Sequence, residues 1–236
     1  MKQKIQIRCK NNKKSQKVEI GSTLFDVFSS FDLKMTHGPV SARVNNKVEG
    51  MHYRVYNSKD VEFLDMNSAS GSRAYTRTLF FVLCKAVQDI YPNTDVVIDI
   101  PVSNGFYVDI RLGRPVVDED VNILRRRMQE IIDSKMPIRR FTVPTEVAIA
   151  LFQEKGDVEK VKLLRTSGSI YTTYYKIGEY VDYYYGTLLT NTSQLYLFGL
   201  EKYYDGMLLR IPSVSSTDEL GEITRQDKMF DIFKEH

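Results

Sequence analysis

The chain has 236 residues, of which 42% are hydrophobic and 27% are charged, and its formal net charge is +3. This composition is typical of a soluble globular protein with one large or two ordinary domains. No apolar run approaches the roughly 18 residues that span a bilayer, and the start lacks the apolar stretch of a signal peptide. We therefore predict a cytoplasmic protein without a membrane partner, in which Cys9 and Cys84 are buried free thiols.

Basic charge is concentrated near the N-terminus. Residues 1–65 contain 12 Lys/Arg and 7 Asp/Glu, and the first 17 residues contain seven basic side chains and no acidic one. Such a patch attracts phosphate groups, but it also keeps an edge strand soluble. No aromatic platform or base-reading motif accompanies the charge, which favours the solubilising role.

The first 66 residues predict a small sheet with one helix. Residues 3–9 and 15–20 alternate with period two and are joined by a polar turn, which indicates a β-hairpin. Ser22 or Thr23 is a suitable N-cap for apolar residues that follow at helical spacing over 24–31. Further short strands, with an Asn-Asn turn between the first two, are predicted at residues 40–46, 47–55 and 60–66. This order favours a β-grasp sheet folded over one helix.

The rest of the chain predicts a larger α+β domain. Residues 67–72 are a linker or a helix start, and helical spacing then runs from Arg73 to Tyr91. Pro144 near the start and Gly156 past the end bound one of the later helices. The other helices are predicted at residues 118–134 and 218–236, and the strands, in part an antiparallel sheet, at residues 95–100, 105–112, 169–177, 179–185, 194–204 and 206–211. The last helical pattern runs to the final residue, so we expect the chain to be the front part of a longer protein.

Residues typical of active sites are scarce. The three histidines are His37, His52 and the final His236, and no Cys/His cluster has metal-ligand spacing. The sequence contains no phosphate loop, dinucleotide fingerprint or nucleophile elbow. The carboxylates of residues 118–120 are better explained as charges at a positive helix start than as an acid–base pair.

The segment 101–112, "PVSNGFYVDIRL", is the most distinctive one. Asn104-Gly105 permits a tight turn with positive φ. Tyr107, Asp109 and Arg111 fall on one face of the strand that follows. The acid and the base of this face pair with each other or line a groove, and the sequence leaves both open.

Several stretches, in order, resemble the N-terminal half of threonyl-tRNA synthetases. They are "ARVNNKVEG", "AVQDIYPNTD", "SNGFYVDIRL", "DEDVNILRRRMQEII", "ALFQEKGDVEKVKLL", "GEYVDYYYG" and "MLLRI". In that family a ubiquitin-like TGS domain precedes the editing module shared with alanyl-tRNA synthetases. The resemblance implies a TGS domain at 1–66, an editing-like domain at 67–213, and a helical linker at 214–236 into a missing C-terminal domain.

The editing family carries His-x-x-x-His on a helix and Cys-x-x-x-His in a later loop, and these groups hydrolyse a mischarged seryl-tRNA ester. The matching positions here are Arg77, Phe81, Tyr184 and Leu188. Arginine stays protonated, tyrosine is a poor base, and the other two side chains accept no proton. The resemblance therefore implies a degenerate pocket without catalytic residues, metal or cofactor in this chain.

A TGS domain and a degenerate editing module also resemble the front of bacterial uridine kinase-type nucleoside kinases. We accordingly expect a non-catalytic, RNA- or nucleotide-binding or regulatory region, with ATP and Mg²⁺ used only by a kinase domain downstream in cis. Its ligand would be tRNA, another RNA or a nucleotide. Candidate binding residues are Tyr107, Asp109, Arg111, Asp182, Tyr183 and Tyr185.

Three alternatives remain open at this stage. The chain could be the editing region of a threonyl-tRNA synthetase that hydrolyses Ser-tRNA(Thr). It could be an interaction domain that only positions the kinase. The tyrosines of the run 180–185 could also be core residues rather than a binding surface, since aromatic side chains contribute heavily to cores.

Overall fold

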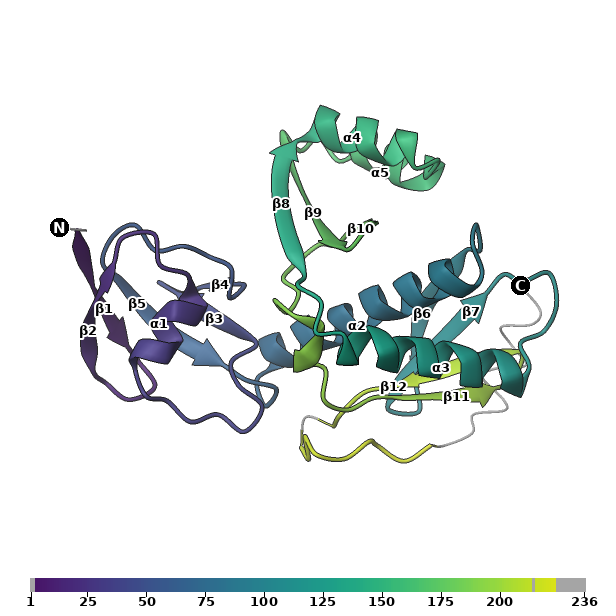
Figure 1. The fold of residues 1–236 in the computed structure, drawn as a ribbon, viewed down its shortest axis with the longest axis horizontal. Coiled ribbons are helices and arrows are strands. Elements are labelled where there is room, and N and C mark those ends of the chain that lie inside the picture. Colours follow the sequence, from purple (N-terminus) through teal and green to yellow (C-terminus); the bar gives the residue numbers. More distant parts are fainter. Residues whose placement is uncertain (1–2, 214, 224–236) are drawn as a thin grey trace.

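The computed structural model describes residues 3–213 and 215–223. Its helices are combined with mixed and antiparallel sheets, so the predicted α+β class is confirmed. Figure 1 shows a small N-terminal domain, a larger domain with two long helices, and an arm, residues 139–183, that projects from the larger domain. None of the described helices has the length and apolarity needed to cross a bilayer.

The small domain is a five-stranded sheet with one helix. Its elements are β1 (Lys4–Cys9), β2 (Ser15–Glu19), α1 (Leu24–Ser30), β3 (Ser41–Val44), β4 (Lys47–Glu49) and β5 (Lys59–Leu64). The strand order is β2-β1-β5-β3-β4, in which β1 and β5 are parallel and the other neighbours are antiparallel. The predicted hairpin, helix and β-grasp arrangement are thereby confirmed.

Two local predictions in the small domain are also confirmed. Thr23 is the N-cap of α1: its hydroxyl accepts from the Asp26 amide at 3.2 Å, and the Asp26 carboxylate accepts from the Thr23 amide at 2.8 Å. Asn45 and Asn46 form the turn between β3 and β4 with φ of 46° and 74°. Positive φ at both central residues is the geometry of a type I′ hairpin.

The large domain packs two helices on one face of an antiparallel sheet. Its elements are α2 (Ala69–Ile90), β6 (Val96–Val102), β7 (Gly105–Ile110), α3 (Asp118–Asp133), the short 3₁₀ helix η1 (Thr192–Gln194), β11 (Gly199–Tyr203) and β12 (Gly206–Arg210). The sheet order is β11-β12-β7-β6. Leu79 of α2, Leu124 and Met128 of α3, and Leu209 of β12 are fully buried in one cluster between helices and sheet.

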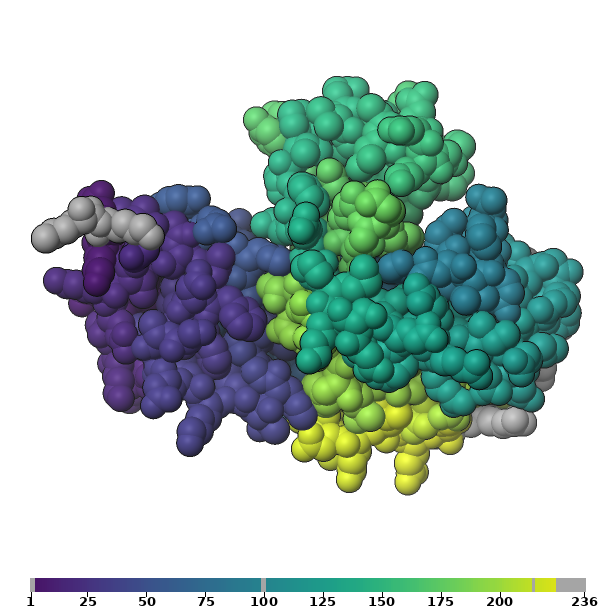
Figure 2. Space-filling model, viewed as in Figure 1, coloured from purple at the N-terminus to yellow at the C-terminus, as the bar shows by residue number. Residues whose placement is uncertain are grey.

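The arm has a separate core. Its elements are β8 (Arg139–Pro144), α4 (Thr145–Glu154), α5 (Val158–Thr166), β9 (Tyr171–Ile177) and β10 (Tyr180–Tyr183), with sheet order β10-β9-β8. Ala148, Ile149, Phe152 and Leu164 form its own small buried cluster. Figure 2 shows the arm standing out from the body, with open notches on both of its sides.

Some sequence predictions need correction. Strand β8 and helix α5 were missed, and the strand predicted at 194–204 forms only at Gly199–Tyr203. The helix predicted at 218–236 is absent from its described part, because residues 218–223 form a turn, a bridge to Pro212 and irregular chain. Residues 224–236 lie outside the described part of the chain.

The turn between β6 and β7 also differs from its prediction. Positive φ occurs at Ser103 (50°) and Asn104 (57°), not at Gly105. Gly105 is required for a different reason: a Cβ atom there would lie 2.5 Å from the carbonyl oxygen of Leu209. The glycine therefore allows close approach of β7 to β12.

Glycine is also required where the two domains join. Ser68 is the N-cap of α2, and its hydroxyl accepts from the Gly71 amide at 3.0 Å. A Cβ atom at Gly71 would lie 1.9 Å from the carbonyl oxygen of Asp65 and 2.5 Å from a methyl group of Val40. The first turn of α2 is thus pressed directly against the end of the small domain.

A second contact joins the small domain to the chain after β12. The ring of His37 stacks on Tyr196 with centroids 3.5 Å apart and 6° between the planes. His37 Nε2 lies 2.7 Å from Asp218 Oδ1, and the Tyr196 hydroxyl donates to the Thr217 carbonyl at 2.7 Å. The segment at 217–218 therefore contacts both domains.

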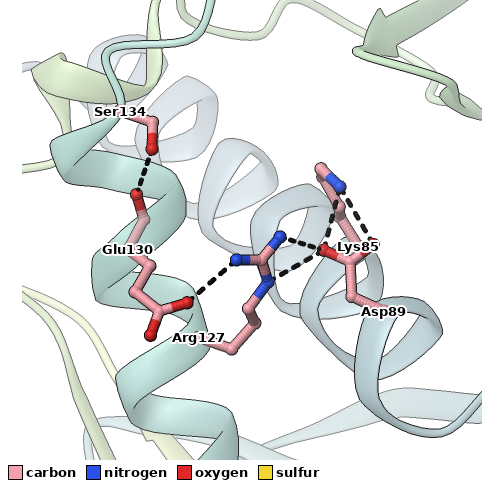
Figure 3. Close-up of polar contacts among 5 residues, drawn as sticks. All are labelled: Lys85, Asp89, Arg127, Glu130 and Ser134. Carbon is pink, nitrogen blue, oxygen red and sulfur yellow. Dashed lines mark hydrogen bonds and ion pairs between the residues drawn. The ribbon is translucent and has the colours of Figure 1, made fainter.

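Figure 3 shows the ion pairs that join α2 to α3. Arg127 of α3 donates to the Asp89 carboxylate of α2 from Nε at 3.0 Å and Nη2 at 2.9 Å, and to Glu130 from Nη1 at 2.8 Å. Lys85 donates to the same Asp89 carboxylate at 2.9 and 3.0 Å. Two cations and two carboxylates balance each other along this seam.

We expect Arg127→Ala to lower the free energy of unfolding by about 1 kcal/mol, because it removes a partly exposed bridge between two helices. Urea denaturation measures the change. Arg126→Ala is the matched control, since Arg126 is an exposed neighbour on α3 and we expect less than about 0.5 kcal/mol there. Equal losses in the two variants would show that the bridge adds nothing to stability.

Candidate functional site

The four positions of the predicted degenerate pocket lie together. Arg77 and Phe81 are one turn apart on α2, and Tyr184 and Leu188 belong to the loop after β10. The rings of Phe81 and Tyr184 meet edge to face with centroids 5.6 Å apart, and Leu188 is 1% exposed. The Leu189 amide donates to the Thr78 hydroxyl at 2.9 Å, which holds the loop on the helix.

Aromatic side chains occupy the space between the helix and the loop. Phe81 is fully buried, and Tyr180 of β10 approaches it from a second side with ring centroids 5.2 Å apart. Burial, followed by the nearby Cys84 and Asp182, raises the pKa of the Tyr184 phenol well above its usual value. The phenol therefore stays protonated at neutral pH and accepts no proton from water.

A polar chain borders these aromatic residues. Lys160 Nζ donates to Asp182 at 2.9 Å and to Asp157 at 2.7 Å. Burial opposes the charge on Lys160, yet the carboxylates of Asp182 and Asp157 raise its pKa overall. Asp182 also accepts from the Tyr180 hydroxyl at 2.9 Å and from the Tyr183 amide at 2.6 Å. Three donors thus occupy the Asp182 carboxylate, which is 7% exposed and poorly placed to act on a water molecule.

The thiol of Cys84 ends this polar chain. Its hydrogen-bonding neighbours are the Tyr184 and Tyr180 hydroxyls. Burial, and then the negative charge of Asp182, raises the pKa of Cys84 to about 12. Because the thiolate and not the thiol is the nucleophile, this cysteine is almost wholly unreactive at neutral pH. Cys84 is a free thiol, as predicted, although it is only partly buried.

The sequence analysis missed Lys160 and the position of Cys84 beside the pocket. A signal for Cys84 was present, because residues 77, 81 and 84 follow one another at helical spacing and fall on one face of α2. Lys160 lies on α5, a helix that was not predicted, and it reaches Asp182 only through the fold of the arm.

The other predicted binding residues are divided between two regions. Tyr107 packs with Val102, Tyr203 and Leu208 on the sheet face opposite α2, and burial raises its pKa to about 12. Asp109 and Arg111 lie on the same strand face as Tyr107, because they alternate with residues that face the helices. None of these three residues therefore joins the pocket.

The tyrosine run 183–185 has three different environments. Tyr183 packs at the edge of the arm core, and Tyr184 packs against Phe81. Tyr185 is 88% exposed. The interpretation of the run as core residues therefore fits the first two tyrosines, and only Tyr185 offers a free ring.

In the folded small domain, the basic residues near the N-terminus lie beside an acidic residue. A shallow hollow of about 310 Å³ on the polar face of β1, β2 and β5 is lined by Arg8 and Lys59 but also by Asp60. It lies on the small domain, apart from the degenerate pocket. Among the described residues, no group of three or more His, Cys, Asp and Glu side chains is arranged to hold a metal ion.

The relatives found by sequence comparison and described here are all threonine–tRNA ligases. The chain is 29% identical over 181 residues to the ligase of Acetivibrio thermocellus, covering 76% of this chain and 28% of that protein. It is 28% identical over 192 residues to the ligase of Clostridium kluyveri, covering 80% of this chain and 30% of that protein. It is 27% identical over 186 residues to the ligase of Azobacteroides pseudotrichonymphae, covering 78% of this chain and 29% of that protein.

The chain thus spans less than a third of the length of these relatives. No protein-family model matches it. The similarity to threonine–tRNA ligases agrees with the resemblance seen in the sequence motifs. None of these three relatives is a nucleoside kinase, and they support the synthetase-like alternative better than the kinase expectation.

Proposed function

We propose that this chain is the N-terminal region of a protein related to threonine–tRNA ligases, and that it contacts the acceptor end of a tRNA without hydrolysing the aminoacyl ester. The observation that supports this is the filled pocket: Arg77, Phe81, Tyr184 and Leu188 lie together around α2. The similarity to threonine–tRNA ligases over 76% of the chain supports tRNA as the ligand.

The chemistry of the pocket supports the absence of hydrolysis. Ester hydrolysis needs a group that positions or deprotonates water, with a pKa near the working pH. Burial and the neighbouring Arg73 lower the pKa of Arg77, but an arginine remains a proton donor at neutral pH. The phenol of Tyr184 and the thiol of Cys84 both have raised pKa values. None of these three side chains is therefore suited to general-base catalysis near neutral pH.

Incubation of purified protein with Ser-tRNA(Thr) tests this function. We expect serine release no faster than in buffer, together with retarded migration of uncharged tRNA(Thr) at low salt that weakens at moderate salt. The salt dependence follows from phosphate contacts by basic side chains. Serine release well above buffer would contradict the first part of the proposal. Failure to bind tRNA(Thr) at either salt concentration would contradict the second part.

A second candidate function is editing hydrolysis that uses Cys84. The observation in its favour is the thiol beside Tyr184, together with the Lys160–Asp182 ion pair next to it. Serine release that disappears in Cys84→Ser, and persists in the matched Cys9→Ser variant, would support this candidate. Cys9 is a suitable control because it is fully buried in the small domain.

The kinase expectation, with ATP, Mg²⁺ and a kinase domain in cis, stays a prediction of the sequence. A uridine phosphorylation assay with ATP, on a natural protein that contains this chain, tests it directly.

A further inference from the structure

We infer that a cluster of four basic side chains, at the junction of the small domain, α2 and the arm, binds a phosphate group. The four are Arg73 and Arg77 of α2, Arg140 of β8, and His52 of the small domain. We call them the junction cluster. Only Arg77 belongs to the degenerate pocket, and the inference does not depend on tRNA being the ligand.

The loop after β10 and strand β9 bring the arginines of two elements together. Arg140 and Tyr175 are directly opposite each other in the β8–β9 register. The Tyr175 hydroxyl donates to the Gly186 carbonyl at 2.8 Å. A Cβ atom built at Gly186 would lie 2.7 Å from Cζ and Nη1 of Arg77, so the guanidinium rests directly on this glycine. Tyr175 and Gly186 therefore connect Arg140 of the arm with Arg77 of α2.

The small domain reaches the same place. A Cβ atom at Gly50 would lie 3.5 Å from the side chain of Thr187, the residue after Gly186. His52 follows two residues later, and its ring lies against the backbone of Ile138 at the base of the arm. Three parts of the fold thus contribute to the junction cluster.

The positive charge of the junction cluster is not balanced. Among the described residues, Arg73, Arg77 and Arg140 form no ion pair with a carboxylate. After burial, Arg73 lowers the pKa of Arg77, and Arg140 lowers the pKa of His52. A group of like charges without counter-ions creates a positive potential that attracts anions.

His52 gives an independent indication of a missing partner. Its Nε2 atom is buried and has no hydrogen-bond partner. Buried polar atoms without a partner are rare in folded proteins, because each costs the free energy of a lost hydrogen bond. A neutral imidazole nitrogen accepts from a P–OH group, and a protonated one donates to a phosphate oxygen. A phosphate oxygen that reaches this buried nitrogen would satisfy His52 in either form.

Phosphate is the anion that this set of groups fits best. Arginine guanidinium groups bind phosphate oxygens in a bidentate manner, and three of them can surround a tetrahedral anion. Tyr185 precedes Gly186 and is 88% exposed, so its ring is free to stack on a nucleobase. The phosphate could therefore come from a free phosphate compound or from a nucleotide, and the experiment has to distinguish these sources.

Isothermal titration with pyrophosphate, at constant ionic strength, tests the site. We expect the wild-type chain to bind pyrophosphate and Arg140→Gln to bind it at least about tenfold more weakly, because one bidentate partner is lost. Arg140 is exposed, so the variant should keep its fold, and circular dichroism checks this. The matched control is Arg139→Gln, since Arg139 is also exposed but points to the opposite face of β8. We expect unchanged affinity in the control.

Two outcomes would overturn the inference: no binding of pyrophosphate by the wild-type chain, or equal losses of affinity in Arg140→Gln and Arg139→Gln. Titration with AMP then identifies the source of the phosphate. Tighter binding of AMP than of inorganic phosphate, lost in Tyr185→Ala, assigns the site to a nucleotide, whereas equal binding assigns it to the phosphate group alone. Pyrophosphate binding without tRNA binding would support the junction cluster and contradict only the proposed function.

Discussion

Phe81→Ala is expected to lower the free energy of unfolding by about 3–5 kcal/mol, the usual range for a fully buried phenylalanine. Phe81 is 0% exposed and contacts the rings of Tyr180 and Tyr184. Alanine would leave a cavity where the degenerate pocket is now filled. Chemical denaturation measures the loss, and Phe25→Ala is the control, because Phe25 is 42% exposed and we expect less than about 1 kcal/mol there.

The same variant tests whether aromatic side chains fill the pocket. An apolar cavity of this kind binds small apolar molecules, and a ligand that binds only the folded state raises its stability. We therefore expect benzene to raise the melting temperature of Phe81→Ala and to leave that of the wild type unchanged. A loss below about 1 kcal/mol in Phe81→Ala would mean that Phe81 does not fill the space between α2 and the loop.

Gly71→Ala is expected to destabilise the chain by about 3 kcal/mol or more. In an ordinary exposed helix the same change stabilises by about 1 kcal/mol, because alanine has the higher helix propensity. Here the new methyl group would lie 1.9 Å from the Asp65 carbonyl oxygen, which is backbone and has little room to move. The steric clash therefore reverses the sign of the effect.

Thermal and urea denaturation of Gly71→Ala measure this effect. Ser70→Ala is the matched control, since Ser70 lies in the same helical turn and its hydroxyl accepts a hydrogen bond from the exposed Arg73. We expect a change within about 0.5 kcal/mol in the control. A Gly71→Ala variant as stable as the wild type would mean that the small domain is not pressed against α2 in the way described.

Elements with a strong local pattern could be predicted from the sequence. The apolar residues Val121, Leu124, Met128 and Ile131 recur at helical spacing, and all four are buried in α3. Asp120 lies in the first turn of the same helix and accepts from the Val117 amide at 2.9 Å, so its interpretation as a helix-start charge is confirmed.

Elements whose stability comes from neighbours could not be predicted. Strand β8 reads "RRFTVP", with two arginines at one end and a proline at the other, and it forms because it pairs with β9 over its whole length. Helix α5 has only Leu164 fully buried, so its apolar pattern is weak. Within residues 218–223 the predicted helix does not form, and Leu220 instead pairs with Pro212 in a β-bridge.

The candidate site, too, could be predicted only where its residues follow a local pattern or a family motif. Arg77 and Phe81 share a helix face, and the resemblance to the editing family supplied their partners in the loop at 184–188. The contacts of Lys160 with Asp182 and of Arg140 with Tyr175 depend on how the arm folds. Such contacts join residues 22 and 35 positions apart, and no local spacing in the sequence reports them.

The separate core of the arm has a consequence for the pocket. Contiguous parts of a protein with few shared buried contacts open with their own, smaller free energies. Its helical tip, α4 and α5 around Phe152, is such a part, whereas Tyr175, Ile177 and Tyr180 of β9 and β10 pack in the core of the large domain. Opening of the tip would therefore leave in place the contacts that Phe81 makes with Tyr180 and Tyr184. The filled pocket is anchored in the core of the large domain, and opening of the tip alone does not uncover it.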